Sequence, residues 1–340
     1  SVTRACESHI YDYGHVQGFI RLREQMVVQL HQIGMLARPE QMVCTQGVSS
    51  AIDLMARYFL KAGDAVLVDD PSWFWLFESL RKHGLRVIGV PRDEDGPNIE
   101  ILTRVMAHDK PKLYLTNSVL HNPTSFGLSP ARAYQVLRLL DEHDCYMLED
   151  DIYGDFHAGV SKGAPALRYA ALDQFKRVFY VAGFSKSLAA GLRVAVVCCP
   201  QAHVQGFVGQ KMLSGLSSPE MNEAVVHRLL VDGQHRRHLE KLRLRVANAH
   251  ERMRVALPKI GLVYPPQTQD GLFVWVDTGV DTNALALAAM NEGWLVAPGG
   301  LFSPSQGVST FMRLNVARTT DAFLNWLGAY LKSVQAQPQT

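Results

Sequence analysis

Residues 182–193 read AGFSKSLAAGLR, and apolar runs with β-branched residues precede them at 177–181 and follow them at 194–198. Such runs are typical of buried strands, and the small residues between them allow a tight loop in which Lys186 and Arg193 face one cavity. A lysine in a dry pocket has a lowered pKa and can form a Schiff base with an aldehyde. Arginine suits a phosphate, because its planar fork of donors is permanently charged. An aldehyde and a phosphate together describe pyridoxal 5′-phosphate (PLP); the alternative is a surface loop with two solvated cations.

The composition favours a globular protein of two lobes, because 340 residues with 47% hydrophobic content can bury a large core. A net charge of +2, from 34 basic and 32 acidic residues, gives no overall field that would attract nucleic acid or a membrane. The five cysteines have neither metal-ligand nor disulfide spacing, and Cys145, Cys198 and Cys199 are predicted to be buried thiols in a reducing compartment. With no membrane-length apolar run and no signal peptide before the first helix, we expect a cytoplasmic protein.

Strand-like and helix-like segments alternate through the first half of the chain. This alternation predicts parallel strands joined by right-handed crossovers, and ligands of such sheets bind at the carboxyl ends of the strands. The expected strands are 41–45, 65–68, 85–90, 112–116 and 145–148, and the expected helices are 19–34, 51–60, 73–82, 99–107 and 131–142.

Three polar segments fall near the expected strand ends. The turn 46–50 opens a helix whose first amides form an anion site by geometry and dipole, although a serine at a helix start is common in any protein. Trp73 either stacks on a planar ring or simply covers helix and sheet. Asn122 begins an Asn-Pro-Thr turn and presents its amide at a strand end, and His121 beside it is expected to be a packed or exposed loop residue.

Three carboxylates, Glu149, Asp150 and Asp151, directly follow the strand at 145–148. One interpretation is the magnesium site of a carboxylate–metal hydrolase. Another is a single buried carboxylate, Asp150, that keeps a pyridine nitrogen protonated while the Tyr153 phenol contacts the ring hydroxyl. The metal interpretation has no partner cluster except two aspartates after the strand at 65–68, and it leaves the basic residues of 182–193 without a role. The pyridine interpretation is therefore preferred, and no metal is expected.

The rest of the chain predicts a second lobe. An arginine-rich helical region spans 222–257, and its interleaved apolar and acidic residues favour a solvated helix face that bridges the lobes rather than a nucleic-acid stripe. In the compact α+β segment that follows, Arg313 on an apolar strand needs either an anion or an outlet to solvent at a sheet edge. The expected strands are 271–276, 294–296 and 311–316, and the expected helices are 283–292 and 320–332.

Taken together, the motifs resemble the fold-type I, class I/II aminotransferase family over essentially the whole chain. They are Tyr13-Gly14 with Gly18 and Leu22-Arg23, Thr45 with Gly47, Asn122-Pro123-Thr124, Asp150 with Tyr153, Ser185-Lys186, Arg193 and Arg313. Within that family the chain looks most like the aminotransferase-like domain of MocR-type transcriptional regulators of the GntR superfamily. The closer likeness lies in Thr116-Asn117-Ser118, the segment 148–153, the loop 213–219 and Ala297-Pro298-Gly299.

The resemblance implies an α/β fold, the PLP-transferase fold type I, with a large, mostly parallel sheet sandwiched by helices and a smaller α+β C-terminal domain. It implies a large PLP-binding domain at 14–235 and a small domain at 236–340 that also takes in 1–13. The family's N-terminal arm or winged helix-turn-helix is expected to be absent from this chain, so DNA would be contacted only through a domain outside it. A homodimer with shared active sites that bind an amino acid or amine is also implied.

The family's residue roles carry over to matching positions as expectations. Lys186 forms the Schiff base and shuttles the proton, Asp150 pairs with the pyridine nitrogen, and Arg313 binds the substrate α-carboxylate. Asn122 and Tyr153 contact the ring hydroxyl, with Asn122 also near the substrate, and Trp73 takes the stacking position. Phosphate contacts are expected from the Val48 and Ser49 amides, Ser185, Arg193 and, across the dimer, Tyr13.

Two hypotheses for function follow from this resemblance. The first is the effector-sensing domain of a MocR-type regulator, and the second is a free-standing aminotransferase that transfers an amino group from an L-amino acid to a 2-oxo acid. Two positions depart from the family pattern: Gly183 stands where Ser or Thr is frequent, and Ser125 stands where Gly usually follows Asn-Pro-Thr. The substrate side chain is expected to meet His15, His121, Phe302 and the loop 301–306.

Overall fold

The computed structural model describes residues 13–159, 165–266 and 270–336, and its larger sheet has eight strands in the order β1-β8-β7-β6-β5-β2-β3-β4. The neighbours β7, β6, β5, β2 and β3 are parallel, whereas β8, β1 and β4 run antiparallel to the strands beside them. This confirms the mostly parallel large sheet. The strands are β1 (Met42–Thr45), β2 (Ala65–Asp70), β3 (Arg86–Asp93), β4 (Gly96–Pro97), β5 (Leu113–Thr116), β6 (Tyr146–Asp150), β7 (Val178–Gly183) and β8 (Ala195–Cys198).

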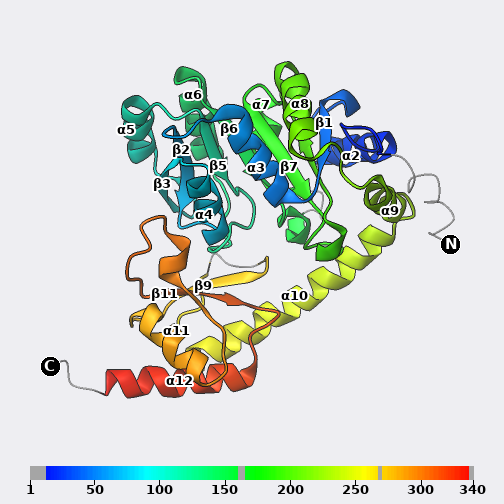
Figure 1. The fold of residues 1–340 in the computed structure, drawn as a ribbon. Helices are drawn as coiled ribbons and strands as arrows, with labels where there is room; N and C mark the ends of the chain where they lie inside the picture. Colours follow the sequence, from blue (N-terminus) through cyan, green and yellow to red (C-terminus); the bar gives the residue numbers. More distant parts are fainter. Residues whose placement is uncertain (1–12, 160–164, 267–269, 337–340) are drawn as a thin grey trace.

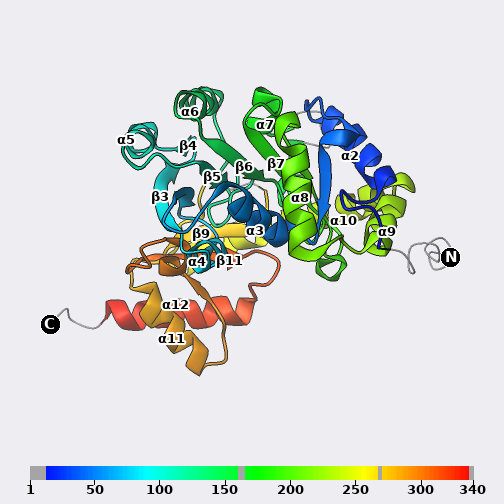
Figure 2. The same cartoon turned by 45° about the horizontal axis from the view of Figure 1, so that its top comes forward.

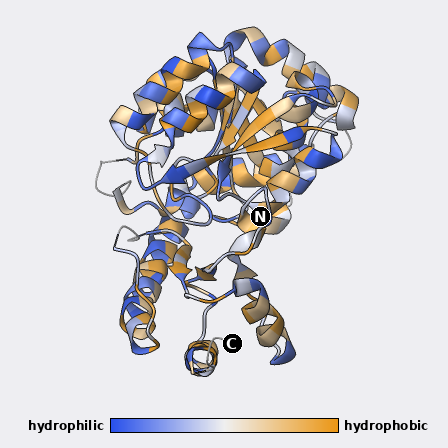
Figure 3. Cartoon of the chain, turned by 90° about the vertical axis from the view of Figure 1, so that its left-hand side faces the viewer, coloured by the Kyte–Doolittle hydropathy of each residue, from blue (hydrophilic) through white to orange (hydrophobic). Residues whose placement is uncertain are grey.

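Helices cover both faces of this sheet, as Figures 1 and 2 show. Successive strand side chains point to opposite faces, so Leu113 and Leu115 of β5 join one core and Tyr114 joins the other. Because both faces are covered, the strands are largely hydrophobic, and Figure 3 shows them mostly in orange. One core receives α3 (Val48–Phe59), α4 (Phe74–Lys82) and α8 (Val204–Gly215); the other receives α2 (Ile20–Gln32), α5 (Ile99–Asp109), α6 (Pro130–Glu142), α7 (Tyr169–Asp173) and α9 (Glu220–Val231).

The smaller sheet is antiparallel, in the order β10-β11-β9, and a third hydrophobic core joins it to its own helices. Helix α10 (Gln234–Lys259) runs from α9 beside the large sheet to α12 in the small domain, which confirms the bridging helix (Figure 1). The proposed division at 235/236 falls at its start and stays a prediction, and residues 1–12 lie outside the described ranges. The remaining elements are β9 (Phe273–Asp277), α11 (Thr282–Asn291), β10 (Ala297–Pro298), β11 (Phe311–Asn315) and α12 (Asp321–Gln335).

Several expected boundaries were wrong, for local reasons. The region 222–257 is two helices, because Gly233 adopts the left-handed conformation (φ 66°) between α9 and α10. Residues 294–296 are not a strand; Trp294 donates its N–H to Ala289 O at 2.8 Å at the end of α11, and the pairing begins only at β10. The helices α7 and α8 were not predicted, and α8 takes the first part of the loop expected at 213–219.

The three cysteines predicted to be buried are buried, and each carries a free thiol: Cys145, Cys198 and Cys199. In the ranges that the structure describes, no helix has the length and apolar character needed to cross a membrane.

Candidate active site

A cavity of about 490 Å³ opens at the carboxyl ends of the central parallel strands, where the small sheet meets the large one. This is the edge at which open α/β sheets bind ligands, and the volume is in the usual range for small-molecule sites. Of the residues expected to contact the cofactor or the substrate carboxylate, all except Tyr13 line it: Val48, Ser49, Trp73, Asn122, Asp150, Tyr153, Ser185, Lys186, Arg193 and Arg313.

Lys186 lies in the loop after β7, with the charges of Asp150, Arg193 and Arg313 around it. Loss of hydration in the cavity lowers the pKa of its amine, and the positive charges of Arg313 and Arg193 lower it further, while Asp150 opposes them. A larger share of the amine is therefore neutral than in an exposed lysine. A neutral amine is the form that attacks an aldehyde or accepts a proton.

Asp150 ends β6 and accepts a hydrogen bond from the Ile152 N–H at 3.0 Å. Burial raises the pKa of its carboxyl to about 7. The hydrogen bond from Ile152 and the charge of Lys186 lower this pKa, and the charge of Asp151 raises it. A carboxylate held in this way gains most from a cationic partner such as a protonated pyridine nitrogen.

The neighbouring carboxylates point to separate partners and do not form a ligand cluster with Asp150. Glu149 accepts from the N–H groups of Tyr169 and Ala170, each at 2.8 Å, and from the Ser118 hydroxyl. Asp151 pairs with Arg168 at 2.7 Å. Among the described residues, no group of three or more His, Cys, Asp or Glu side chains is placed to hold a metal ion.

Another part of the cavity lining carries hydrogen-bond donors that suit a phosphate. Helix α3 begins at Val48, three residues earlier than expected, so the amides of Val48 and Ser49 belong to its first turn and have no partner within the helix. Arg193 donates through Nη2 to Gln46 O at 3.1 Å and to Ser49 Oγ at 2.9 Å. A Cβ at Gly47 (φ 85°) would lie 2.6 Å from this Nη2, so only glycine lets the guanidinium approach the helix start.

The departure at Gly183 has a packing reason. A Cβ there would lie 2.7 Å from Val48 Cγ2, so a larger residue would push the start of α3 away from the lysine loop. The departure at Ser125 is also accommodated: the residue adopts φ 58° and its hydroxyl donates to Phe273 O of the small sheet at 2.8 Å.

Trp73 lies at the start of α4 and stacks on Trp75, with ring centroids 4.9 Å apart and an interplanar angle of 25°. Both indoles line the cavity. Trp75 was not predicted as a site residue, although its spacing of two residues from Trp73 at an expected helix start is visible in the sequence. The pair offers a flat aromatic wall for a planar ring.

Arg313 lies on β11, the central strand of the small sheet, so the alternative of an edge-strand arginine that reaches solvent is wrong. Its guanidinium lies 4.3 Å from the Phe273 ring centroid and 4.9 Å from that of Phe302. Nη1 donates to Asn122 Oδ1 at 2.8 Å, while Nε is buried without a hydrogen-bond partner within the described residues. Burial lowers the pKa of this arginine, which marks a cation short of counter-charge.

Asn122 and Tyr153 lie between Arg313 and Asp150 at the wall of the cavity. Tyr153 is buried, packs edge-on against Phe273, and has a raised phenol pKa because of that burial. Asn122 accepts from Arg313 with its oxygen, so its NH₂ group remains to donate.

Some expected contacts are not made in the single chain. His121 does not line the cavity; it is fully buried and faces Asp69, so its expected place in the substrate pocket was wrong. His15 and the loop 301–306 are also absent from the lining, although Phe302 contacts Arg313. Tyr13 is 81% exposed and outside the cavity, and its contact across a dimer stays a prediction.

The cavity fits PLP on its own features. A lysine with a lowered pKa, a carboxyl with a raised pKa, an aromatic wall and an anion-binding helix start are all present, and the orphaned Nε of Arg313 calls for a further anion such as a carboxylate.

A family model described as aminotransferase class I and II matches residues 7–327. The chain is 32% identical over 288 residues to a 2-aminoadipate transaminase of Thermus thermophilus. The matched residues make up 82% of this chain and 71% of that enzyme. It is 27% identical over 311 residues to the HTH-type transcriptional regulator YdcR of Escherichia coli, covering 88% of this chain and 64% of the regulator. The chain thus spans about two thirds of the regulator's length.

Solved structures agree with this match. The α-aminoadipate aminotransferase LysN of Thermus thermophilus, complexed with N-(5′-phosphopyridoxyl)-L-leucine, superposes with a TM-score of 0.86 at 27% identity, covering 98% of this chain and 87% of LysN. The kynurenine aminotransferase of Pyrococcus horikoshii has a TM-score of 0.89 at 24% identity and covers 100% of this chain and 87% of that one, which supports the fold.

Proposed function

The chain belongs to the class I and II aminotransferase family, whose cofactor is PLP, and we propose that it forms a Schiff base with an amino acid or amine as the effector-sensing domain of a MocR/GntR-type transcriptional regulator. In this proposal a separate helix-turn-helix domain contacts DNA, and the protein acts in the cytoplasm. The observation that carries the amino-acid site is Arg313, a partly buried cation in the same cavity as Lys186, whose buried Nε has no hydrogen-bond partner among the described residues.

We assign the cofactor contacts to the residues at the two ends of the cavity. Lys186 holds the aldehyde carbon, Asp150 keeps the pyridine nitrogen protonated, and Trp73 lies against the ring. Asn122 and Tyr153 take the ring hydroxyl. The phosphate is held by Arg193, Ser185 and the first amides of α3, at Val48 and Ser49.

Bound PLP would supply an aldehyde for the substrate amine and a ring that accepts the electron pair left when the α-proton departs. Arg313 binds the substrate carboxylate and so orients the α-carbon. Lys186, once displaced, can take the α-proton, and its lowered pKa increases the share of the amine that is neutral and able to do so. Asp150 stabilises the added charge by keeping the ring nitrogen cationic.

The protein is proposed to act as a homodimer, because the aminotransferases of this family function as dimers and Tyr13 is available at the surface to reach a neighbouring subunit. The Tyr13 carbonyl accepts a hydrogen bond from the Ser217 hydroxyl, which fixes the backbone beside α9. Sedimentation of the PLP-loaded protein, with Tyr13→Ala compared for PLP retention, tests both points.

A second candidate is a free-standing aminotransferase. The 32% identity to the 2-aminoadipate transaminase favours it, since this exceeds the 27% identity to YdcR. Both candidates share the cofactor and the first exchange of amines, and they differ in whether amino-group transfer is completed.

A visible-absorption titration of the PLP-loaded protein with a panel of amino acids distinguishes the two. Under the sensing proposal, at least one amino acid shifts the cofactor band without converting it to the pyridoxamine form. Complete conversion by one donor, reversed by a 2-oxo acid, contradicts the sensing proposal and favours the enzyme. Protein that takes up no PLP contradicts both.

A further inference from the structure

Asn122 is carried by the segment 117–127, which connects β5 to the start of α6. Two of its residues, Leu120 (φ 51°) and Ser125 (φ 58°), adopt the left-handed conformation without being glycine. A residue other than glycine keeps this backbone conformation only where contacts with the surrounding structure hold it there. The segment therefore needs a source of order outside its own backbone.

Arg92 of β3 supplies contacts at both ends of this segment. Its side chain is 1% exposed; Nη1 donates to Asn117 O at 3.1 Å, and Nη2 donates to Gly127 O at 2.8 Å. A single planar guanidinium thus bridges the first and the last residue of 117–127. Neither Arg92 nor its counter-ion lines the cavity.

The counter-ion is Asp69 of β2, which is fully buried and lies 3.2 Å from Arg92 Nη1. Its carboxylate also accepts from Tyr114 at 2.5 Å and Thr116 at 2.7 Å. The Arg92 charge and the approach of His121 outweigh burial, so the pKa of Asp69 falls to about 2 and the carboxylate stays ionised at neutral pH.

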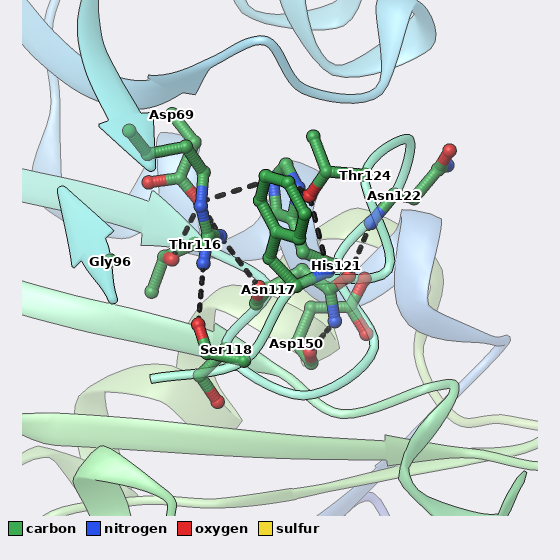
Figure 4. A network of polar contacts seen from close by, with 12 residues as sticks. Asp69, Gly96, Thr116, Asn117, Ser118, His121, Asn122, Thr124 and Asp150 are labelled. Carbon is green, nitrogen blue, oxygen red and sulfur yellow. Dashed lines mark hydrogen bonds and ion pairs between the residues drawn. The ribbon is translucent and has the colours of Figure 1, made fainter. Parts of the chain in front are cut away.

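The same carboxylate lies near His121 of the segment, although Nε2 of this ring makes no hydrogen bond within the described residues. Nε2 of His121 lies 3.5 Å from Asp69 Oδ2, and Nδ1 lies 2.9 Å from Thr124 Oγ1 (Figure 4). Burial and the nearby Arg92 lower the pKa of His121 to about 4, so the ring is neutral and can donate on one side while it accepts on the other. His121 and Thr124 stand on either side of Asn122 and Pro123.

Asn117 extends the network to the cofactor wall. Its amide donates to Asp150 O at 2.7 Å, and its oxygen accepts from the Asn122 N–H at 2.9 Å (Figure 4). Asn122 in turn accepts from Arg313 at 2.8 Å. The contacts of Arg92 and Asp69 therefore lead to the end of β6, to Asn122 and to the substrate-binding arginine.

We propose that the buried Asp69–Arg92 pair is a positioning device that sets Asn122, and through it Arg313, in the conformation that meets cofactor and substrate. Arg92 holds the two ends of 117–127 at a fixed separation, and Asp69 holds Arg92 in place through their ion pair and lies close to His121 near the centre of the segment. The pair acts from outside the cavity. The proposal rests on the proposed function only for what Asn122 and Arg313 bind.

The first test uses PLP-free protein and compares Arg92→Lys with Arg132→Lys. Lysine retains the charge for Asp69 but lacks the planar fork needed to reach Asn117 O and Gly127 O together. Arg132 is the matched control, because it donates to two backbone carbonyls, Gly96 O and Pro97 O, and pairs with Asp93 without contacting 117–127.

We expect Arg92→Lys to raise the native-state hydrogen exchange of the Asn122 N–H and its neighbours in 117–127 at least tenfold. The Arg132→Lys protein should exchange there like the wild type. Equal exchange in the two variants overturns the proposal whatever the protein binds. Should Arg92→Lys fail to fold, Thr124→Val serves instead, because it removes the contacts of the Thr124 hydroxyl with His121 and with the Phe126 N–H. It is expected to show a smaller increase in the same segment, and unchanged exchange there is the contradicting result.

The second test adds PLP and follows the visible absorption against pH. The positive charge of Arg313 near Lys186 lowers the pKa of the lysine nitrogen. If Asn122 and Arg313 are less well held in Arg92→Lys, the pH at the midpoint of the absorption change should be higher than in the wild type. In Arg132→Lys this pH should be unchanged. An unmoved midpoint in Arg92→Lys contradicts the positioning role. Wild-type protein without a cofactor band would instead contradict the proposed function, and the hydrogen-exchange result would stand.

Discussion

Replacing Arg313 with methionine should separate ligand binding from stability. Among the described residues, the guanidinium has one hydrogen bond, to Asn122, and its buried Nε has no partner. The guanidinium contacts the rings of Phe273 and Phe302. Methionine is unbranched and of similar length, so it can keep the contacts with both rings. Removing a partly buried cation removes its desolvation cost, while Asn122 Oδ1 loses a donor, so the stability of the ligand-free protein should change by no more than about 1 kcal/mol.

The effect on amino-acid binding should be large. Truncating one partner of a buried, hydrogen-bonded charge pair costs about 2–5 kcal/mol. At about 1.4 kcal/mol for each tenfold change, the Kd for the amino acid should rise roughly 30- to 4000-fold. Because Arg313 is the charge that most lowers the pKa of Lys186, the variant should also have a higher lysine pKa.

Two assays measure these effects on the same protein. Spectral titration of PLP-loaded wild type, Arg313→Met and Arg252→Met gives the Kd for an amino acid, and urea unfolding of the PLP-free proteins gives stability. Arg252 is the control, since it lies on α10 outside the cavity and is partly exposed. An Arg313→Met protein that binds amino acids within threefold of wild type, or that loses more than about 2 kcal/mol of stability, would refute the substrate role.

Three further substitutions give separate expectations. Asp150 has a pKa raised to about 7, above the usual value of an unfolded chain, so the PLP-free wild type should lose stability as the pH rises from about 4 to about 7. In urea unfolding, Asp150→Asn should show a smaller loss of stability over this pH range. The PLP-loaded variant should exchange the α-proton of the amino acid about 10²–10⁴-fold more slowly than the wild type. An identical pH profile in the two proteins would count against the raised pKa. Glu149→Leu leaves the Tyr169 and Ala170 N–H groups without their acceptor, so it should cost about 1–3 kcal/mol in thermal unfolding while the PLP spectrum is retained; loss of the spectrum with no loss of stability would contradict the structural role. Trp75→Ala removes the ring stacked on Trp73, so PLP affinity measured by equilibrium dialysis should fall about 2- to 13-fold, whereas wild-type affinity would show that Trp73 needs no support.

Much of the site could be predicted from sequence because its chemistry is tied to local patterns. Asp150 ends an apolar strand, Lys186 and Asn122 lie in the loops that follow two others, and the carboxyl ends of parallel strands meet at one edge of a sheet. Once these strands are identified in the sequence, several residues that line the cavity can be predicted without knowledge of any tertiary contact.

Other features depend on contacts between distant segments, and the sequence does not carry them. Arg92 and Asp69 lie on different strands, and nothing local distinguishes Arg92 from a solvated arginine. The place of Arg313 on a central strand follows from the order β10-β11-β9, which a single strand pattern cannot give. The glycine at 183 is explained only by the approach of Val48 from another element.

The most direct test of the account is to reduce the PLP-loaded protein with borohydride and to locate the modified residue by peptide mass mapping. Reduction fixes a Schiff base as a stable secondary amine on the lysine that formed it. We expect one pyridoxyl group on Lys186 and none in the Lys186→Ala protein. A pyridoxyl group on another lysine, or wild-type protein that carries none, would contradict this expectation.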